Sequence, residues 1–204
     1  MTAISDIMQT ASVIPVIVVD EVDHAVPLAR ALVAGGLRVL EVTLRTPAAL
    51  DAIKAMKQVE GAIVGAGTVT NQQELADAIA AGSEFIVSPG LTESLGKAAT
   101  REGIPFLPGI ANAGDIMRGL DLGLSHFKFF PAMAAGGLPA LKALAAPFGQ
   151  CRFCPTGGIT LENAPDWLEF DPVLCVGGSW VAPRGAIDEE QVEKVAREAA
   201  ALGR

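Results

Sequence analysis

The stretch His126-Phe127-Lys128-Phe129-Phe130-Pro131 predicts a buried β-strand that carries one lysine inside an aromatic run. Side chains alternate between the two faces of a strand, so Phe127 and Phe129 share one face and Lys128 lies on the other. We expect the two phenylalanines to pack outward against helices and Lys128 to point inward. Burial disfavours a charged ammonium, and a neutral amine is a nucleophile, so the stretch predicts Schiff-base chemistry at Lys128. A structural ion pair with a buried carboxylate is the alternative.

Short apolar runs of this kind alternate with amphipathic stretches rich in alanine and leucine from one end of the chain to the other. The predicted strands cover residues 14–19, 39–43, 62–66, 85–88, 105–107, 127–130, 152–155 and 174–176. The predicted helices cover residues 23–34, 47–57, 71–81, 93–102, 112–122, 138–146, 161–167 and 189–201.

Parallel strands joined by helices form either an open doubly wound sheet or a closed barrel, and about eight repeats favour closure. No G-x-G-x-x-G motif follows the first strand, so the main fingerprint of a dinucleotide-binding sheet is missing. We therefore expect an α/β fold, a small (β/α)8 TIM barrel, as a single domain over residues 1–204.

Composition and charge restrict the partners and the location of the protein. With 204 residues, of which 50% are apolar, the chain is long enough to bury a full core. A net charge of -8 and a pI near 4.7 oppose general attraction to nucleic acid or to an anionic membrane. The apolar run at residues 13–19 is too short for a membrane span, and no basic segment of a signal peptide precedes it. A cytoplasmic protein is expected.

The cysteines and histidines predict neither disulfides nor a metal centre. The odd number of cysteines argues against a disulfide framework, and Cys151 and Cys154 lie on a predicted strand, whereas a redox C-x-x-C pair begins at a helix start. His24 and His126 are far apart and lack the carboxylate spacing of a zinc or iron site. We expect chemistry that needs no metal and no cofactor.

Barrels of this class build their active sites at the carboxyl ends of the strands, and polar residues gather at those points. Glu41, Thr43 and Arg45 follow one another on one face of the second strand and its extension. A carboxylate at Glu41 can therefore meet the amine of Lys128 at the barrel mouth. The guanidinium of Arg45 suits a substrate carboxylate, although an arginine at a strand end can also bridge surface acids.

Two glycine-rich loops follow the predicted seventh and eighth strands, at residues 156–158 and 177–179. Such loops can simply permit tight turns. Their joint appearance at this point of the chain favours a phosphate site made of backbone N–H groups. A substrate that carries a carboxylate, a carbonyl and a phosphate fits all of these groups.

Six segments in the same order resemble the 2-keto-3-deoxy-6-phosphogluconate (KDPG) aldolases, and the resemblance spans nearly the whole chain. The segments are EVTLR at 41–45, GAGTV at 65–69, VSPG at 87–90, FKFFPA at 127–132, PTGGI at 155–159 and GGSW at 177–180. The resemblance implies a class I aldolase of the Entner–Doudoroff pathway, which releases pyruvate and glyceraldehyde 3-phosphate. It also implies activity on 4-hydroxy-2-oxoglutarate, which yields pyruvate and glyoxylate, and a homotrimer.

The resemblance assigns a role to each candidate residue. Lys128 would form the Schiff base, Glu41 would act as the general acid and base, and Arg45 with Thr68 would hold the substrate carboxylate. The pyruvate pocket would be shaped by Pro89, Phe130 and Thr156. The distal phosphate would be held by Gly157, Gly158, Gly178 and Ser179.

The chain departs from the family pattern at two places and leaves other functions open. Met133 stands where an acidic residue is usual, and Ala111-Asn112-Ala113 lacks the usual Thr-Pro pair. No residue distinguishes KDPG from 2-keto-3-deoxy-6-phosphogalactonate. A sugar-phosphate isomerase or epimerase and a non-catalytic phospho-sugar-binding barrel are the alternatives on the same fold.

Overall fold

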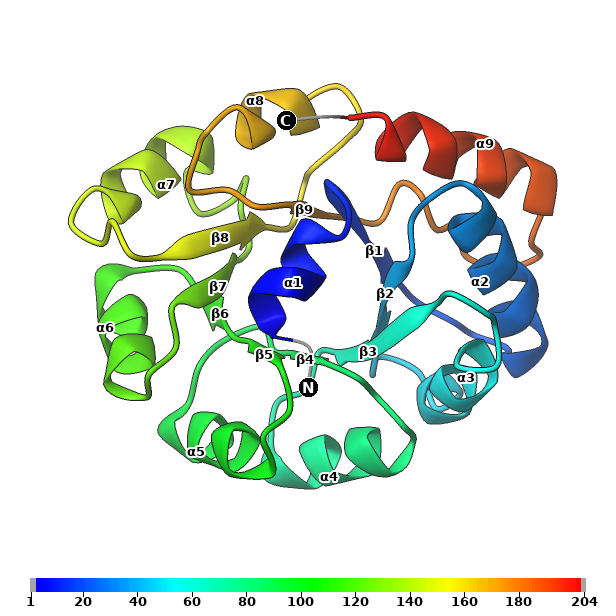
Figure 1. The fold of residues 1–204 in the computed structure, drawn as a ribbon, viewed down its shortest axis with the longest axis horizontal. Helices are drawn as coiled ribbons and strands as arrows, with labels where there is room; N and C mark the ends of the chain where they lie inside the picture. Colours follow the sequence, from blue (N-terminus) through cyan, green and yellow to red (C-terminus); the bar gives the residue numbers. More distant parts are fainter. Residues whose placement is uncertain (1–2, 203–204) are drawn as a thin grey trace.

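The computed structural model describes residues 3–202, which form a ring of parallel strands surrounded by helices (Figure 1). The strands are β1 Val13–Ile17, β2 Val39–Thr43, β3 Ile63–Gly67, β4 Ile86–Val87, β5 Phe106–Leu107, β6 Gly109–Ile110, β7 His126–Phe129, β8 Arg152–Pro155 and β9 Val176–Gly178. The helices are α1 Ile4–Gln9, the 3-10 turn η1 Val22–His24, α2 Ala25–Ala34, α3 Ala49–Met56, α4 Gln72–Ala80, α5 Glu93–Glu102, α6 Ala113–Asp121, α7 Gly137–Ala145, α8 Ala164–Leu168 and α9 Glu189–Ala200.

The strands close into a barrel, which confirms the predicted (β/α)8 fold. One sheet has the order β5-β4-β3-β2-β1-β9, and a second has the order β6-β7-β8. β5 and β6 occupy one strand position, interrupted at Pro108, which has no N–H to donate. Single bridges from Phe153 to Val173 and from Thr156 to Gly177 join β8 to β9 and complete the ring.

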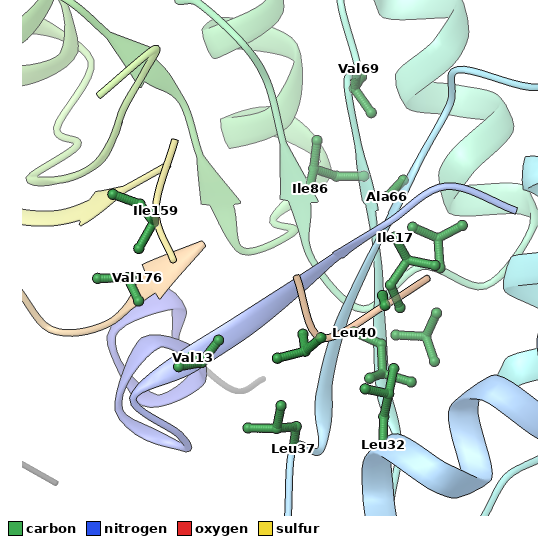
Figure 2. Packing of buried hydrophobic residues seen from close by; sticks show 14 of the residues in the cluster. Val13, Ile17, Leu32, Leu37, Leu40, Ala66, Val69, Ile86, Ile159 and Val176 are labelled. Atoms are coloured by element: carbon green, nitrogen blue, oxygen red, sulfur yellow. The ribbon is translucent and has the colours of Figure 1, made fainter. Parts of the chain in front are cut away.

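Two layers of apolar side chains hold the barrel together. The outer cluster lies between strands and helices, and Figure 2 shows Ile17 of β1 and Leu40 of β2 near Leu32 of α2. Phe127 and Phe129 belong to this cluster, so their predicted outward orientation is confirmed. The second, inner cluster is formed by Ile7, Met8, Ile14, Val39, Phe85, Val87, Leu107, Cys154, Leu174 and Cys175.

Helix α1 covers the amino-terminal end of the barrel and was not predicted (Figure 1). Its six residues are too few for a helical period to stand out in the sequence. Ile7 and Met8 are buried in the inner cluster, so α1 closes the amino-terminal end of the barrel. Chemistry is thereby restricted to the opposite, carboxyl-terminal mouth. Along residues 3–202, no helix is long and apolar enough to cross a membrane.

Most predicted boundaries lie within a few residues of the observed ones. β2, β8 and α5 begin and end where the sequence predicted them. The prediction for the last strand was wrong by two residues, because β9 starts at Val176 and continues to Gly178. α8 starts at Ala164, three residues later than predicted, because the Asn163 side chain accepts a hydrogen bond from the Thr160 N–H and closes a turn before the helix.

Candidate active site

Glu41 of β2 and Lys128 of β7 meet inside the barrel. Nζ of Lys128 donates a hydrogen bond to Oε1 of Glu41 at 2.9 Å, and the two side chains are 5% and 3% exposed, respectively. Both residues point inward, as strand alternation predicted. The pair is also the structural ion pair that the sequence left open as an alternative. Within residues 3–202, neither side chain forms another hydrogen bond. A buried ion pair of this kind adds little stability, so a purely structural role does not account for it.

A glycine on the neighbouring strand makes room for the carboxylate. Gly67 pairs with Thr43 in the β2–β3 register, and a Cβ added to Gly67 would collide with Oε1 of Glu41. Any larger residue there would displace the carboxylate from Lys128. Gly67 belongs to the GAGTV segment of the family resemblance, but the sequence did not predict this role, because it depends on a contact between two strands.

Two further candidate residues, Phe130 and Thr156, follow β7 and β8 directly. The Phe130 ring centroid lies 5.5 Å from Nζ of Lys128, within the range of a cation–π contact. Thr156 is buried directly after β8, and its Oγ1 occupies the space that a side chain on Gly177 would need. The Thr156 N–H donates to the Phe129 carbonyl at 2.9 Å, so Thr156 lies next to the end of the strand that carries Lys128.

Arg45 and Thr68 follow the paired strands β2 and β3, and the Leu44 N–H donates to the Gly67 carbonyl at 2.8 Å between their loops. Arg45 is exposed and, within residues 3–202, forms no hydrogen bond or ion pair, which disfavours the alternative that it bridges surface acids. Thr68 has a φ of 61°, an unusual value for a β-branched residue. Strained backbone of this kind is typical of functional sites.

The two glycine loops lie side by side because the bridge from Thr156 to Gly177 joins β8 and β9. Gly157 and Gly158 have φ values of 103° and 77°, which favour glycine. Gly178 has a different requirement, since a Cβ there would collide with the ring of Trp180. Backbone N–H groups from both loops and the exposed Ser179 therefore lie at the barrel mouth, where an anion can approach them.

Pro89 lies in the loop that follows β4, and a side chain on Gly109 would collide with its carbonyl oxygen. Gly109 is the register neighbour of Lys128 in the β6–β7 pair. Pro89 therefore lies against β6, which is the neighbour of the strand that carries the lysine. Glu41 and Lys128 lie within β2 and β7, and the other candidate residues lie at or beyond the carboxyl ends of their strands.

Thr43 and two of the cysteines have structural contacts instead. Thr43 Oγ1 donates to the Ile17 carbonyl at 2.8 Å and ties β2 to β1. Cys151 belongs to the outer cluster and Cys154 to the inner one, so they lie on opposite faces of the strand and cannot form the redox pair that the sequence already disfavoured. Burial raises the pKa of the Cys151 thiol.

Within residues 3–202, no group of three or more His, Cys, Asp or Glu side chains is arranged to hold a metal ion. His126 begins the strand that carries Lys128, and burial, assisted by nearby Arg152, lowers the pKa of its ring. Its Nδ1 lies 3.2 Å from the hydroxyl of Ser125, away from any cluster of ligands.

The family model and the relatives of high sequence identity point to one family. The family model described as KDPG and KHG aldolase matches residues 4–198. The KHG/KDPG aldolase of Escherichia coli (strain K12) is 56% identical over 202 residues, covering 97% of this chain and 95% of that protein. The crystal structure of the KDPG aldolase of Zymomonas mobilis ZM4 with 3-phosphoglycerate is 59% identical, with a TM-score of 0.97, covering 98% of this chain and 96% of the other.

A third relative was captured with a reaction intermediate. The KDPG aldolase of Legionella pneumophila, solved with pyruvate as a covalent carbinolamine intermediate, is 44% identical to this chain. The TM-score is 0.92, and the match covers 100% of this chain and 99% of the other.

Proposed function

Since the chain belongs to the KDPG and KHG aldolase family and is therefore a carbon–carbon lyase, we propose that it cleaves KDPG to pyruvate and glyceraldehyde 3-phosphate through a Schiff base on Lys128. The observation that carries the proposal is the contact of 2.9 Å between Nζ of Lys128 and Oε1 of Glu41 inside the barrel. The Lys128 amine can act as the nucleophile, and the Glu41 carboxylate lies close enough to accept a proton from this amine and to return it.

The first stage forms the covalent intermediate. Glu41 accepts a proton from the Lys128 ammonium, and the neutral amine attacks the C2 ketone of the substrate. Glu41 passes this proton to the oxygen, which gives the carbinolamine. Glu41 then takes a second proton from the nitrogen and delivers it to the hydroxyl, so that water leaves as the iminium forms. A carbinolamine with pyruvate was captured in the relative from Legionella pneumophila, which supports this path.

The second stage breaks the carbon–carbon bond. Glu41 removes the proton of the C4 hydroxyl, and the C3–C4 electron pair moves into the iminium as glyceraldehyde 3-phosphate leaves. The resulting enamine is protonated at C3, and hydrolysis of the new iminium releases pyruvate and regenerates Lys128. The iminium nitrogen is the electron sink throughout.

The remaining residues bind the substrate at its two ends. Arg45 and Thr68 hold the carboxylate, and Pro89, Phe130 and Thr156 shape the recess for the three-carbon keto acid. Gly157, Gly158, Gly178 and Ser179 hold the distal phosphate. The positive φ values of the first two and the bound 3-phosphoglycerate of the relative from Zymomonas mobilis support this division.

A cleavage assay with three substrates tests the proposal. Pyruvate release is measured with KDPG, with its galactonate epimer and with 4-hydroxy-2-oxoglutarate. We expect the highest kcat/KM with KDPG and slower cleavage of 4-hydroxy-2-oxoglutarate, which lacks the phosphate. Interconversion of sugar phosphates without pyruvate release would favour the isomerase alternative. Saturable binding without any turnover would favour a phospho-sugar-binding barrel.

Three further proposals concern the whole molecule. We propose that residues 1–204 act as one domain, that the protein assembles as a homotrimer and that it works in the cytoplasm. Sedimentation at several concentrations tests the assembly. Limited proteolysis of the folded protein tests the single domain, and fractionation of the producing cells tests the location.

A further inference from the structure

The loop at residues 88–91 follows β4 and is tied to helix α6 by one arginine. We propose that Arg118 is a positioning residue that holds this loop against β6, the strand paired with β7, and thereby keeps Pro89 in place. The inference rests on the proposed function, because Pro89 is taken as a wall of the pyruvate pocket. Arg118 would thus affect substrate binding although it lies outside the proposed pyruvate pocket.

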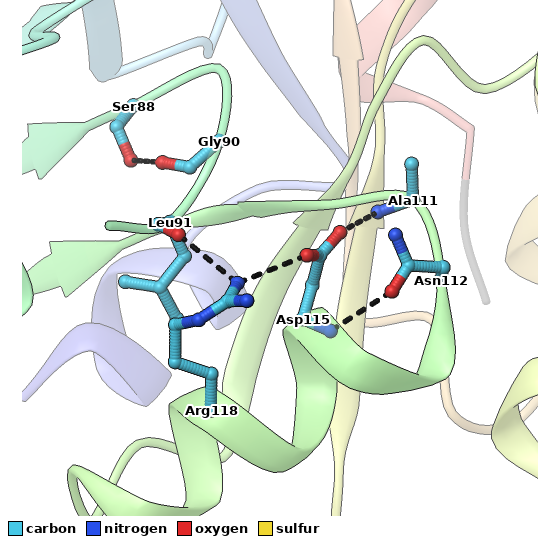
Figure 3. A network of polar contacts seen from close by, with 7 residues as sticks. All are labelled: Ser88, Gly90, Leu91, Ala111, Asn112, Asp115 and Arg118. Carbon is cyan, nitrogen blue, oxygen red and sulfur yellow. Dashed lines mark hydrogen bonds and ion pairs between the residues drawn. The ribbon is translucent and has the colours of Figure 1, made fainter. Parts of the chain in front are cut away.

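Arg118 is itself held in a network at the start of α6 (Figure 3). Its Nη1 donates to Oδ1 of Asp115 at 3.1 Å and to the carbonyl of Leu91 at 3.3 Å. The other carboxylate oxygen of Asp115 accepts the Ala111 N–H at 3.0 Å. The Asp115 N–H is capped by Asn112 at 3.0 Å. The guanidinium therefore joins the first turn of α6 to the end of the loop.

The other end of the loop rests on the strand beside the lysine. The Ser88 hydroxyl donates to the Gly90 carbonyl at 2.7 Å and closes the loop internally. The Pro89–Gly90 peptide lies so close to Gly109 that no side chain fits there. Gly109 pairs in register with Lys128. A displacement of the loop thus changes the position of Pro89 relative to the reactive amine.

Loss of the arginine is expected to loosen the loop without unfolding the barrel. The Leu91 side chain stays buried in the outer cluster, and Arg118 is 45% exposed, so neither the core nor a buried charge depends on the guanidinium. The hydrogen bond to the Leu91 carbonyl is the contact that disappears. A partly exposed hydrogen bond contributes modestly, so we expect an effect of about three- to tenfold.

The experiment follows exchange of the pyruvate methyl hydrogens with D2O by NMR, a partial reaction that uses pyruvate alone. For Arg118→Leu, we expect the KM for pyruvate to rise about three- to tenfold, with kcat within about twofold of the parent. The affinity for glycerol 3-phosphate, a probe of the phosphate loops, should not change. Arg118→Lys should recover part of the loss, because an ammonium can still donate to the carbonyl.

Arg101→Leu is the matched control, since Arg101 is an exposed arginine of α5 that pairs with its neighbour Glu102. It should leave the pyruvate KM unchanged. An unchanged pyruvate KM in Arg118→Leu, or a loss confined to kcat with a lower melting temperature, would overturn the positioning role while leaving the aldolase proposal intact. Absence of exchange in the parent protein would instead overturn the proposed function and this inference with it.

Discussion

The amine of Lys128 and the carboxylate of Glu41 lie 2.9 Å apart although 87 positions separate them in the chain. β2 and β7 bring them together across the barrel interior, and both side chains are almost completely buried. In this geometry one proton can pass directly between nucleophile and base. Catalysis depends on that transfer, whereas a purely structural ion pair requires only the contact.

Replacement of Glu41 by Gln should lower kcat for KDPG cleavage by about two to four orders of magnitude, because proton transfer is lost while the shape of the side chain is kept. The amide oxygen can still accept a hydrogen bond from Lys128, so the variant should fold. Binding of glycerol 3-phosphate, measured by calorimetry, serves as the control and should be retained. Turnover close to that of the parent would remove Glu41 from the acid–base role.

Replacement of Gly67 by Ala should disturb the same carboxylate without changing its chemistry. The added Cβ collides with Glu41, and a displacement of about 1 Å in a catalytic group can lower the rate by about a hundredfold. Cleavage kinetics of KDPG measure the effect. Gly149→Ala is the control, since an added Cβ there meets nothing within 4 Å. Equal activity of the two alanine variants would show that Gly67 does not position Glu41.

Replacement of Gly158 by Ala tests the phosphate loops. At a φ of 77° an alanine is strained, and its Cβ would also press on Met133, so the loop must move. We expect the KM for KDPG to rise about tenfold, while kcat/KM for unphosphorylated 4-hydroxy-2-oxoglutarate changes by less than about twofold. Equal losses with both substrates would mean that the loop supports the barrel and does not hold a phosphate.

Much of the barrel follows from local patterns in the sequence. β2 and β8 begin and end where apolar runs predicted them, because both are buried strands bounded by turns. The inward orientation of Lys128 followed from alternation along β7. Helix α1 was missed because it is too short to show a helical period. Ile7 and Met8 are held in place by their packing in the inner cluster of the barrel.

The residues that support the site were harder to foresee. Glu41 and Lys128 could be paired because alternation along each strand predicted that both side chains meet at the barrel mouth. The need for Gly67 beneath the carboxylate and the reach of Arg118 to the Leu91 carbonyl depend on contacts between elements far apart in sequence. Strand and helix periodicity carries no information about such contacts, so only the folded structure shows them.

Borohydride reduction in the presence of pyruvate, followed by peptide mapping with mass spectrometry, tests whether Lys128 forms the Schiff base. Lys128→Met and a reaction without pyruvate are the controls. We predict a single reduced pyruvyl adduct, located on the peptide that contains Lys128 and absent from both controls. An active protein that shows no adduct, or an adduct on another lysine, would contradict Schiff-base catalysis at Lys128.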